Sequence, residues 1–546
     1  MTTRHFFRPI YVCLMGLVIL AIGCKKDDDT LQLSRRFAPS TVTGANGETS
    51  VTISWPASLF TNLEAVDYTV EISKDNSFTT VDYTTTTSDL SVVVTDEKLA
   101  IKQDYYARVK ANANDKSADS NWSMSSSFRI TGEQFLTAIP SSDIIDVSAI
   151  LRWRANPNLT SIVLTPTPSG TPITLNLTSG DLSTNSKIAT GLTQLTTYNA
   201  EIFQGTKSKG VTSFKTKASI TGTNIIDLTG TTGNPALLKT TLQSNPPSGT
   251  VIILRRGEQY LMDASYAFST SVKIVSALGF GTNLAIIRPT ATFNVTAAAN
   301  IDSIVFKDVI IKGGRAANAS YTNDYVMNVN TASTVKLVRL DGCTIKILRG
   351  VVRGQGTGAG SRFNNYIINN CVLDSINDFS VVAVSNTSAF NNIKITNSTF
   401  FKSLKFINHG VAAPNGVGSQ SVLIENCTFN EVVSNLTANN YLIDYNANNV
   451  TGGITIRNCI FGKTWAAGGT FQQLGFRSGT STGLNIVNTY STSDFTFTAS
   501  PLTGTITYSG ASTTLFTAPG TGDFTIKDAS FAGKLTAGDP RWRPTN

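Results

Sequence analysis

Apolar and polar residues alternate along this chain in two different long-range patterns. In the N-terminal part, runs such as Val51-Thr52-Ile53-Ser54-Trp55 make every second side chain apolar, which is the period of a half-buried β-strand. A second copy of the pattern contains Trp153, and Leu-x5-Tyr runs end at Tyr105 and Tyr198, which are 93 residues apart. This length suits one β-sandwich domain per copy. The predicted sandwiches span residues 37–131 and 132–218.

Beyond residue 219 the alternation becomes a repeat. An apolar strand followed by a polar pair and a small residue returns at intervals of 27 to 34 residues. Each unit is too short to bury its own core, so the units must stack as the coils of a solenoid. Recurrent asparagines predict a ladder of amide hydrogen bonds: Asn370, Asn397, Asn426, Asn458 and Asn488. Recurrent cysteines predict an internal stack of free thiols rather than disulfides: Cys343, Cys371, Cys427 and Cys459.

Both patterns resemble known families. The early Trp and the Leu-x5-Tyr run are similar to the fibronectin type III module, which implies spacer domains. A short helix with Leu238 and Leu242, followed by Val251–Tyr260, resembles the start of pectate-lyase-like β-helices, including chondroitinase-B-like polysaccharide lyases. The segment 538–544 resembles the close of Bacteroidota surface lipoproteins of uncharacterised function. The resemblance implies an all-β chain that ends in a right-handed single-stranded parallel β-helix (the pectin lyase fold) over residues 219–546, with an N-terminal cap.

The first residues have the layout of a secretion signal. Arg4 and Arg8 precede an apolar run that ends at Cys24, and this run is too short to span a membrane. We therefore expect a lipoprotein signal peptide at 1–23, lipidation of Cys24 and a charged tether at 24–36. The alternative is an ordinary signal peptide cut near Gly23. The Lys-then-acidic start of the tether resembles a signal for the outer face of the outer membrane, which predicts a lipid-anchored protein at the cell surface.

Composition excludes several classes of function. The 546 residues include only two histidines, and His5 lies in the predicted leader, which leaves His409 as the one imidazole. A zinc site built from several histidines is therefore excluded, and a Ser/His/Asp triad would need His409. The chain also contains no GxxxxGK[ST] phosphate loop and no CxxC pair.

The positive charge is unevenly placed. The net charge is +8, and residues 220–546 contain 24 Lys and Arg against 16 Asp and Glu. A basic strip on a solenoid suits an anionic chain such as an acidic polysaccharide, whereas nucleic acid fits the charge but not the surface location. Scattered solvated cations are the alternative. The excess is concentrated in one strip: Lys336, Arg339, Lys346, Arg349, Arg353 and Arg362. The predicted substrate-binding residues from this strip are Arg349, Arg353 and Arg362.

Aligned strands of successive coils suggest a site. If the apolar alternation points inward, Arg353, Asn408 or His409, Asp444 and Arg477 form one outward stripe, although a slip of one residue would reverse the face. A lyase must neutralise a uronate carboxylate and supply a base for the C5 proton. The substrate-binding candidates here are Asn408 and Asp444, and the catalytic candidates are Lys402, Lys405, His409 and Arg477.

A metal-dependent reaction has weaker support. Ca²⁺ needs several convergent oxygens, and the possible ligands Asp374, Asp378, Glu431 and Asp444 form no acidic cluster in the sequence. No metal ligand is therefore assigned, although Ca²⁺ stays open as a cofactor. A hydrolase would need two facing carboxylates, for which Asp374 with Asp378, or Glu431 with Asp444, are the candidates.

The predicted function is that of a monomeric cell-surface lipoprotein that binds an acidic polysaccharide. One hypothesis adds depolymerisation by β-elimination. The alternatives are a non-catalytic glycan-binding or adhesion protein and a purely structural surface protein.

Overall fold

The structure is a computed structural model that describes residues 35–61, 65–313, 324–411, 413 and 416–544. The predicted leader 1–23, the lipidation site Cys24 and nearly all of the tether 24–36 lie outside the described residues. The chain divides into two compact units, and the second of them contains residues 216–546. The sandwich domains and the β-helix are therefore described separately.

The first sandwich has the strand order of a fibronectin type III module. Three antiparallel strands form one sheet and four form the other. Trp55 and Tyr68 pack in its core with ring centroids 5.5 Å apart. The Tyr105 hydroxyl accepts a hydrogen bond from the backbone N–H of Ala100 at 3.1 Å, which closes the Leu-x5-Tyr turn as a tyrosine corner. The strands are β1 (Thr43–Asn46), β2 (Ser50–Ser54) and β5 (Ser91–Thr95), facing β4 (Tyr83–Thr87), β3 (Tyr68–Ser73), β6 (Tyr106–Ala111) and β7 (Ser123–Met124).

The second sandwich repeats the four-stranded sheet and pairs two strands in the other. Trp153 is only 4% exposed, so this side chain belongs to the core and not to a sugar-binding surface. Tyr198 stacks on Phe214 at 5.7 Å. The strands are β8 (Ser148–Arg152) with β11 (Ser186–Thr190), and β10 (Ile173–Asn176), β9 (Ser161–Thr167), β12 (Thr197–Gln204) and β13 (Lys207–Lys215).

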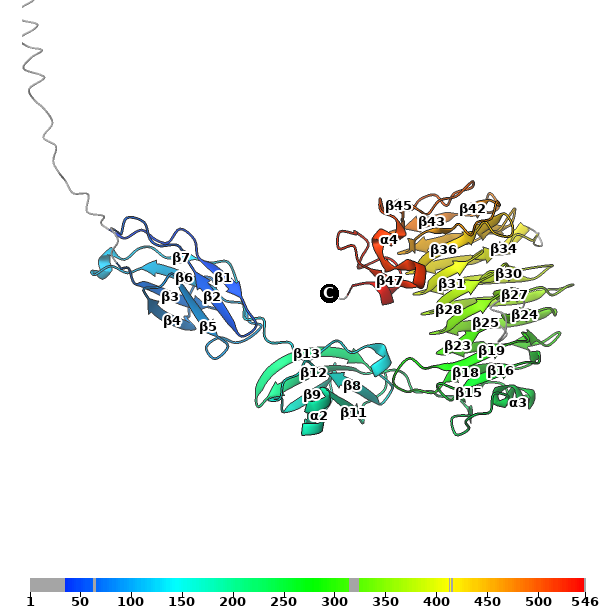
Figure 1. Ribbon diagram of the computed structural model, residues 1–546, viewed down its shortest axis with the longest axis horizontal. Coiled ribbons are helices and arrows are strands. Elements are labelled where there is room, and N and C mark those ends of the chain that lie inside the picture. The colour runs from blue at the N-terminus through cyan, green and yellow to red at the C-terminus, as the bar shows by residue number, and fades with distance from the viewer. Residues whose placement is uncertain (1–34, 62–64, 314–323, 412, 414–415, 545–546) are drawn as a thin grey trace, which may run out of the picture. The chain divides into compact units, whose positions relative to one another are not determined.

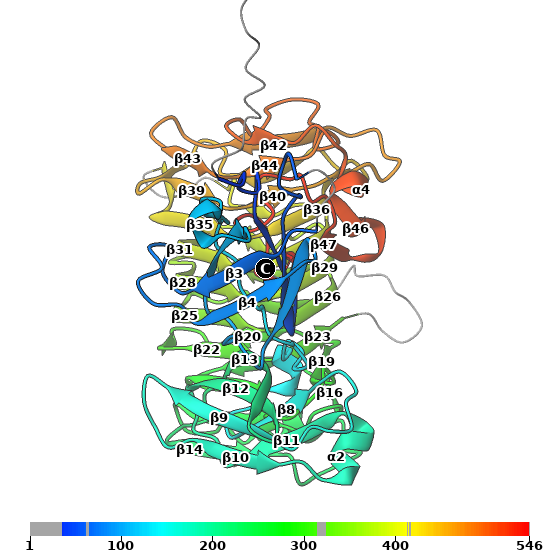
Figure 2. The same cartoon turned by 90° about the vertical axis from the view of Figure 1, so that its left-hand side faces the viewer.

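A parallel β-helix fills the chain from about residue 224, so the predicted fold class is confirmed. Its coils are built from short strands that pair with the equivalent strands of neighbouring coils, mainly in three parallel sheets. A separate two-stranded parallel sheet pairs β34 (Val417–Ser419) with β38 (Asn449–Val450). Figures 1 and 2 show these strands stacked one above another. The short helix α3 (Leu237–Gln243) stands at the N-terminal end and buries Leu238 and Leu242. It covers the first coil, as a solenoid end requires.

The first sheet has eleven described strands. They are β14 (Asn224–Asp227), β15 (Thr250–Leu254), β18 (Val272–Ser276), β21 (Asn300–Ile301), β22 (Ile304–Lys307), β25 (Ser333–Asp341), β28 (Ser361–Asn369), β31 (Ala389–Thr396), β35 (Ser421–Glu425), β39 (Ile454–Arg457) and β43 (Leu484–Val487).

The second sheet also has eleven described strands, and the third has eight. The second sheet contains β16 (Gln259–Met262), β19 (Ala285–Pro289), β23 (Val309–Lys312), β26 (Thr344–Leu348), β29 (Val372–Ile376), β32 (Thr399–Ser403), β36 (Thr428–Ser434), β40 (Ile460–Phe461), β41 (Thr464–Trp465), β44 (Tyr490–Ser491) and β45 (Ile506–Thr507). The third sheet contains β17 (Tyr266–Phe268), β20 (Phe293–Val295), β24 (Tyr325–Val329), β27 (Gly350–Gly354), β30 (Val382–Val384), β33 (Ile407–Asn408), β37 (Asn440–Asp444) and β42 (Gln473–Arg477).

The recurrent asparagines occupy the turn between the first and second sheets. All five have positive φ, between 44° and 54°, a conformation that asparagine tolerates better than most residues. Asn426 donates to Asn397 at 3.2 Å, and Asn488 donates to Asn458 at 2.8 Å. The amide of Asn397 donates to Asn369 and not to Asn370. The predicted ladder is therefore interrupted between Asn370 and Asn397. The recurrence of asparagine therefore reflects the backbone turn as well as the ladder.

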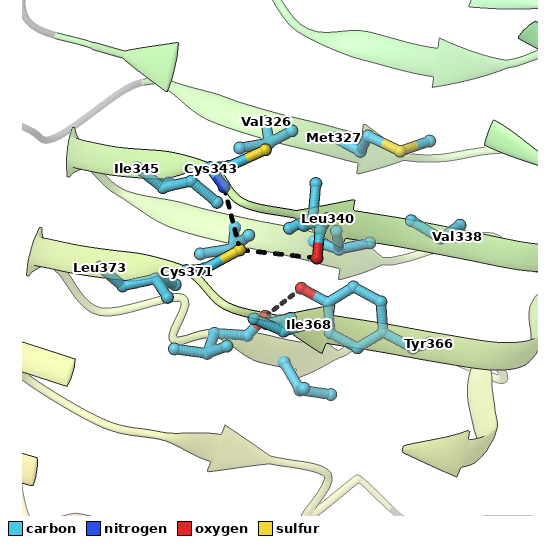
Figure 3. Packing of buried hydrophobic residues seen from close by; sticks show 14 of the residues in the cluster. Val326, Met327, Val338, Leu340, Cys343, Ile345, Tyr366, Ile368, Cys371 and Leu373 are labelled. Carbon is cyan, nitrogen blue, oxygen red and sulfur yellow. Dashed lines mark hydrogen bonds between the residues drawn. The ribbon is translucent and has the colours of Figure 1, made fainter. Parts of the chain in front are cut away.

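The cysteines line the interior directly beside this turn. Figure 3 shows Cys343 above Cys371, with the Cys343 backbone N–H donating to the Cys371 Sγ at 3.4 Å. Cys343, Cys371, Cys427 and Cys459 are all buried and free, as predicted. Ser398 occupies the equivalent position on the coil between those of Cys371 and Cys427. Its hydroxyl accepts a hydrogen bond from the Cys371 N–H at 3.0 Å.

A C-terminal segment crosses the outside of the second sheet. We call residues 538–543 the clasp. The Gly538 N–H bonds the Asn458 carbonyl, and the Trp542 indole N–H bonds Thr399 at 2.7 Å. Arg541 reaches the Asn370 side chain at 2.9 Å, 171 residues earlier in the chain. The clasp therefore ties several coils to one another from outside.

The thiol stack yields a test of the interior. Burial raises the pKa of the Cys371 and Cys427 thiols, and thiolate is the reactive form. We expect the four solenoid cysteines to resist an aromatic disulfide reagent in the native protein and to react fully after denaturation without reductant. Rapid native labelling, or a mass lower by the hydrogens lost in disulfide formation, would contradict this arrangement.

Candidate functional site

The outer face of the third sheet contains the predicted stripe. Direct register pairs join Arg353 to Ala383, Ala383 to Asn408, Asn408 to Asp444 and Asp444 to Arg477. The predicted alignment of these strands is therefore confirmed. Neighbouring strands lie about 4.8 Å apart, so the ends of the stripe are separated by roughly 19 Å. All of its members except Ala383 are partly exposed.

One end of the stripe is an ion pair stacked on an aromatic ring. Arg477 donates to both carboxylate oxygens of Asp444, at 2.7 and 3.0 Å. The guanidinium lies over the Tyr441 ring, 4.4 Å from its centroid. Hydrogen bonding to Asp444 is the main reason why the pKa of Arg477 is raised. Arg477 is therefore a permanently charged group with a fixed orientation, and it cannot act as a base.

The other end has two arginines on one ring. Arg349 and Arg353 lie over Phe379, at 4.4 and 3.9 Å from its centroid. Arg349 forms a two-pronged pair with Asp378 at 3.0 and 3.1 Å, whereas Arg353 donates to the Ser385 hydroxyl at 3.1 Å. Arg353 makes no ion pair among the described residues. The guanidinium of Arg353 is therefore less neutralised than that of Arg349 or Arg477.

Lys405 lies between the two ends. Its side chain precedes β33, and the nearest carboxylates that act on it are Asp378 and Asp444. Burial lowers the pKa of Lys405, and the two carboxylates oppose that shift. No described group forms an ion pair or hydrogen bond with the ammonium. Lys405 is thus a partly buried cation whose hydrogen-bonding capacity is left for a ligand or water.

His409 does not belong to the outward stripe, so this part of the prediction is wrong. The imidazole is 0% exposed and stacks on Tyr445 with centroids 5.1 Å apart. Its Nε2 accepts from the Phe390 N–H at 3.4 Å, and Nδ1 has no partner. Burial lowers the pKa of His409 to about 4. The strand ends at Asn408 and the chain turns inward, which removes His409 from contact with any external substrate.

Two other predicted site residues lie away from the stripe. Lys402 is on β32 of the second sheet, with its Nζ 4.0 Å from Glu431 and 4.6 Å from the Phe401 ring centroid. Arg362 is on β28 of the first sheet, and its guanidinium donates to the Thr387 carbonyl. The stripe therefore brings together Arg349, Arg353, Lys405, Asn408, Asp444 and Arg477, without Lys402, Arg362 or His409.

The predicted basic strip is also divided between faces. Lys336 and Arg339 are on β25 of the first sheet and pair with Asp302 and Asp341. Lys346 is on the second sheet, in register with Asp374. Within the described residues, no group of three or more His, Cys, Asp or Glu side chains has the geometry of a metal site.

Aromatic residues of the site were missed by the sequence analysis. Phe379 and Tyr441 each support an arginine, and Tyr325 packs against Phe379 at 5.8 Å. Apolar alternation assigns such residues to the interior. The sequence does contain a signal for them, which is that each aromatic residue stands within three positions of a candidate carboxylate. Phe379 directly follows Asp378, and Tyr441 precedes Asp444 by three residues.

Comparisons with known proteins identify parts of the chain only. Residues 258–403 match the family model "Domain of unknown function (DUF4957)", and residues 422–542 match "Domain of unknown function (DUF5123)". No curated protein matches the chain.

Two of the solved structures that are similar to this chain consist of fibronectin type III domains. The FN1–FN3 domains of chicken CNTN1 are 15% identical with a TM-score of 0.17, covering 34% of this chain and 68% of that one. A two-domain fibronectin type III segment of chicken tenascin is 15% identical with a TM-score of 0.17, covering 33% and 99%. The strand orders described above, and not these scores, establish the sandwich topology.

Membrane-spanning helices were sought as well. No helix in the described ranges combines the length and the apolar character needed to cross a bilayer.

The buried histidine makes stability depend on pH. The folded pKa of about 4 lies below the usual histidine pKa of 6.5, so the unfolded chain takes up this proton first as the pH falls. We expect the wild-type protein to lose about 3 kcal/mol relative to a His409→Gln variant between pH 6.5 and 4. Denaturant unfolding at several pH values measures the difference. An identical pH dependence in both proteins would contradict a buried neutral imidazole.

Proposed function

We propose that the protein is a cell-surface lipoprotein that binds an acidic polysaccharide along the outer face of the third sheet. The observation that carries this proposal is the stripe, in which charged side chains from successive coils lie in register beside aromatic rings. Coil stacking repeats the strands along the solenoid axis, so a polymer that lies along this axis meets a new side chain at every coil.

Electrostatics support an anionic ligand. Of the four cations on this face, Arg349 and Arg477 have carboxylate partners within 3.1 Å, whereas Arg353 and Lys405 have no ion pair among the described residues. The unpaired charges attract an anion, and the Asn408 amide between the ends can bond sugar hydroxyls. Phe379 and Tyr441 hold the arginine planes in place, which lowers the conformational cost of binding.

The remaining parts of the proposal concern location. A lipid on Cys24 would hold the protein on the outer membrane, with the sandwiches as spacers between anchor and β-helix. Labelling with a fatty-acid analogue tests the anchor: the wild-type protein should incorporate the label and Cys24→Ser should not. If Ca²⁺ is a cofactor, Asp378 and Asp444 are the carboxylates of this face that would hold it.

The binding test uses heparin, chondroitin sulfate, pectate and alginate with the full chain. The double variant Arg353→Gln, Lys405→Gln should bind at least one of these glycans about tenfold more weakly than the wild-type protein, equivalent to ~1.4 kcal/mol. Its affinity should also fall less steeply than that of the wild-type protein as the salt concentration rises. Lys336→Gln is the matched control, because Lys336 is an exposed cation on the first sheet. Equal losses in both proteins would show that general charge, and not this face, binds the glycan. Absence of all binding would leave a structural role.

A β-elimination activity is the second candidate, favoured by the lowered pKa of Lys405. The neutral amine of Lys405 would take the C5 proton while Arg353 neutralises the uronate carboxylate. The C4–O bond would then break to form the C4–C5 double bond, and the departing glycan oxygen would take a proton from the Lys405 ammonium or from water. The same incubations should then generate ultraviolet-absorbing unsaturated uronate. Lys405→Met should abolish this product, whereas the matched change Lys336→Met on the first sheet should leave it in place. Binding without any such product would assign the face to adhesion alone.

A further inference from the structure

One corner of the third sheet contains a buried phenol that the stripe does not include. Tyr325 begins β24 and is only 3% exposed, yet it lies outside the hydrophobic cluster of the β-helix interior. Its ring packs on Phe379 with centroids 5.8 Å apart and a 53° angle between planes. Tyr325 therefore packs on the same ring over which Arg349 and Arg353 lie.

The buried Tyr325 hydroxyl makes no well-formed hydrogen bond, and no described group accepts its proton, although Arg349 and Arg353 lie close enough to donate toward its oxygen. The charged groups that act on it are Arg349, Arg353 and Asp378. Guanidinium groups only donate, so neither arginine can accept the phenol proton, and both oxygens of Asp378 already accept from Arg349. Burial raises the pKa of Tyr325, so the hydroxyl keeps its proton. A buried donor without an acceptor costs stability, and such groups often await a ligand or an ordered water.

The same corner has unbalanced positive charge. Two guanidinium groups share the Phe379 ring, and the single carboxylate Asp378 pairs with only one of them. Both Nε and a terminal nitrogen of Arg353 bond the Ser385 hydroxyl, which carries no charge. Like charges held this close are unfavourable unless an anion lies between them.

The backbone is shaped to permit this arrangement. Gly350 is the register partner of Tyr325 on the next coil. A Cβ at position 350 would lie 2.9 Å from the Phe379 Cβ and 2.8 Å from the Phe379 carbonyl oxygen. A larger residue would therefore displace the ring on which both arginines rest.

We infer that Tyr325, Arg349, Arg353 and Phe379 form a discrete subsite for one oxyanion group of the glycan. The phenol and the free edge of the Arg353 guanidinium donate to its oxygens, while Asp378 holds Arg349 in place and Phe379 supports both cations. This inference rests on the proposed function and adds a specific subsite to it. A uronate carboxylate and a sulfate ester share the required chemistry.

The test uses monosaccharide probes on the full chain. Glucuronate and N-acetylglucosamine 6-sulfate are titrated separately by ligand-observed NMR, with N-acetylglucosamine as the neutral control. At least one charged sugar should bind and the neutral sugar should not, and the preferred probe identifies the oxyanion. Tyr325→Phe removes only the hydroxyl and should weaken the preferred probe about fivefold to tenfold. Arg353→Gln should weaken it at least as much.

Tyr266→Phe is the matched control, because Tyr266 is a second buried phenol whose hydroxyl has no hydrogen-bond partner within the described ranges, and it lies on β17 at the start of the third sheet, outside the stripe. This variant should leave monosaccharide affinity unchanged, and thermal unfolding should confirm that all variants fold. Equal affinity of Tyr325→Phe and the wild-type protein would overturn the subsite. If the wild-type protein binds polysaccharide but neither charged monosaccharide, the subsite is refuted and the proposed function is not. If the wild-type protein binds neither, both are refuted.

Discussion

In-register stacking of parallel strands between successive coils is the constraint on which the rest of the β-helix depends. A coil contributes strands of only two to nine residues to its sheets, and these cannot bury a core without the coils on either side. Phe400, Phe429 and Phe461 illustrate the result: they are register partners, and their rings stack at 4.9 and 4.6 Å. The same register that aligns these rings inside the solenoid aligns Asn408, Asp444 and Arg477 outside it.

Much of the architecture could be predicted because the repeat records this register in the sequence. Once the repeats are aligned, Asp444 and Arg477 fall side by side on neighbouring strands, which is their register in the structure. The failures occur where strands are short and the chain turns. His409 comes one residue after the two-residue strand β33 and points inward. Lys402 lies within β32 but has a φ of 55°. Strict alternation of side chains between the two faces of the sheet does not apply at such an irregular position.

Charge counting was less informative than charge pairing. The basic residues of 336–362 were expected to form one strip. Lys336 and Arg339 instead lie on the first sheet, where they form ion pairs with Asp302 and Asp341. The contributions of Phe379 and Tyr441 could not be predicted, because alternation cannot distinguish an outward aromatic residue at a corner from an inward one. The site depends on which cations lack a partner, and that property is visible only when the side chains are placed.

The clasp has a consequence for the order of events during synthesis. Its contacts join residues that are 171 and 143 positions apart, Arg541 with Asn370 and Trp542 with Thr399. A ribosome makes the clasped coils long before residues 538–543, so the coils can stack as they are made but remain unfastened on that side until the clasp follows.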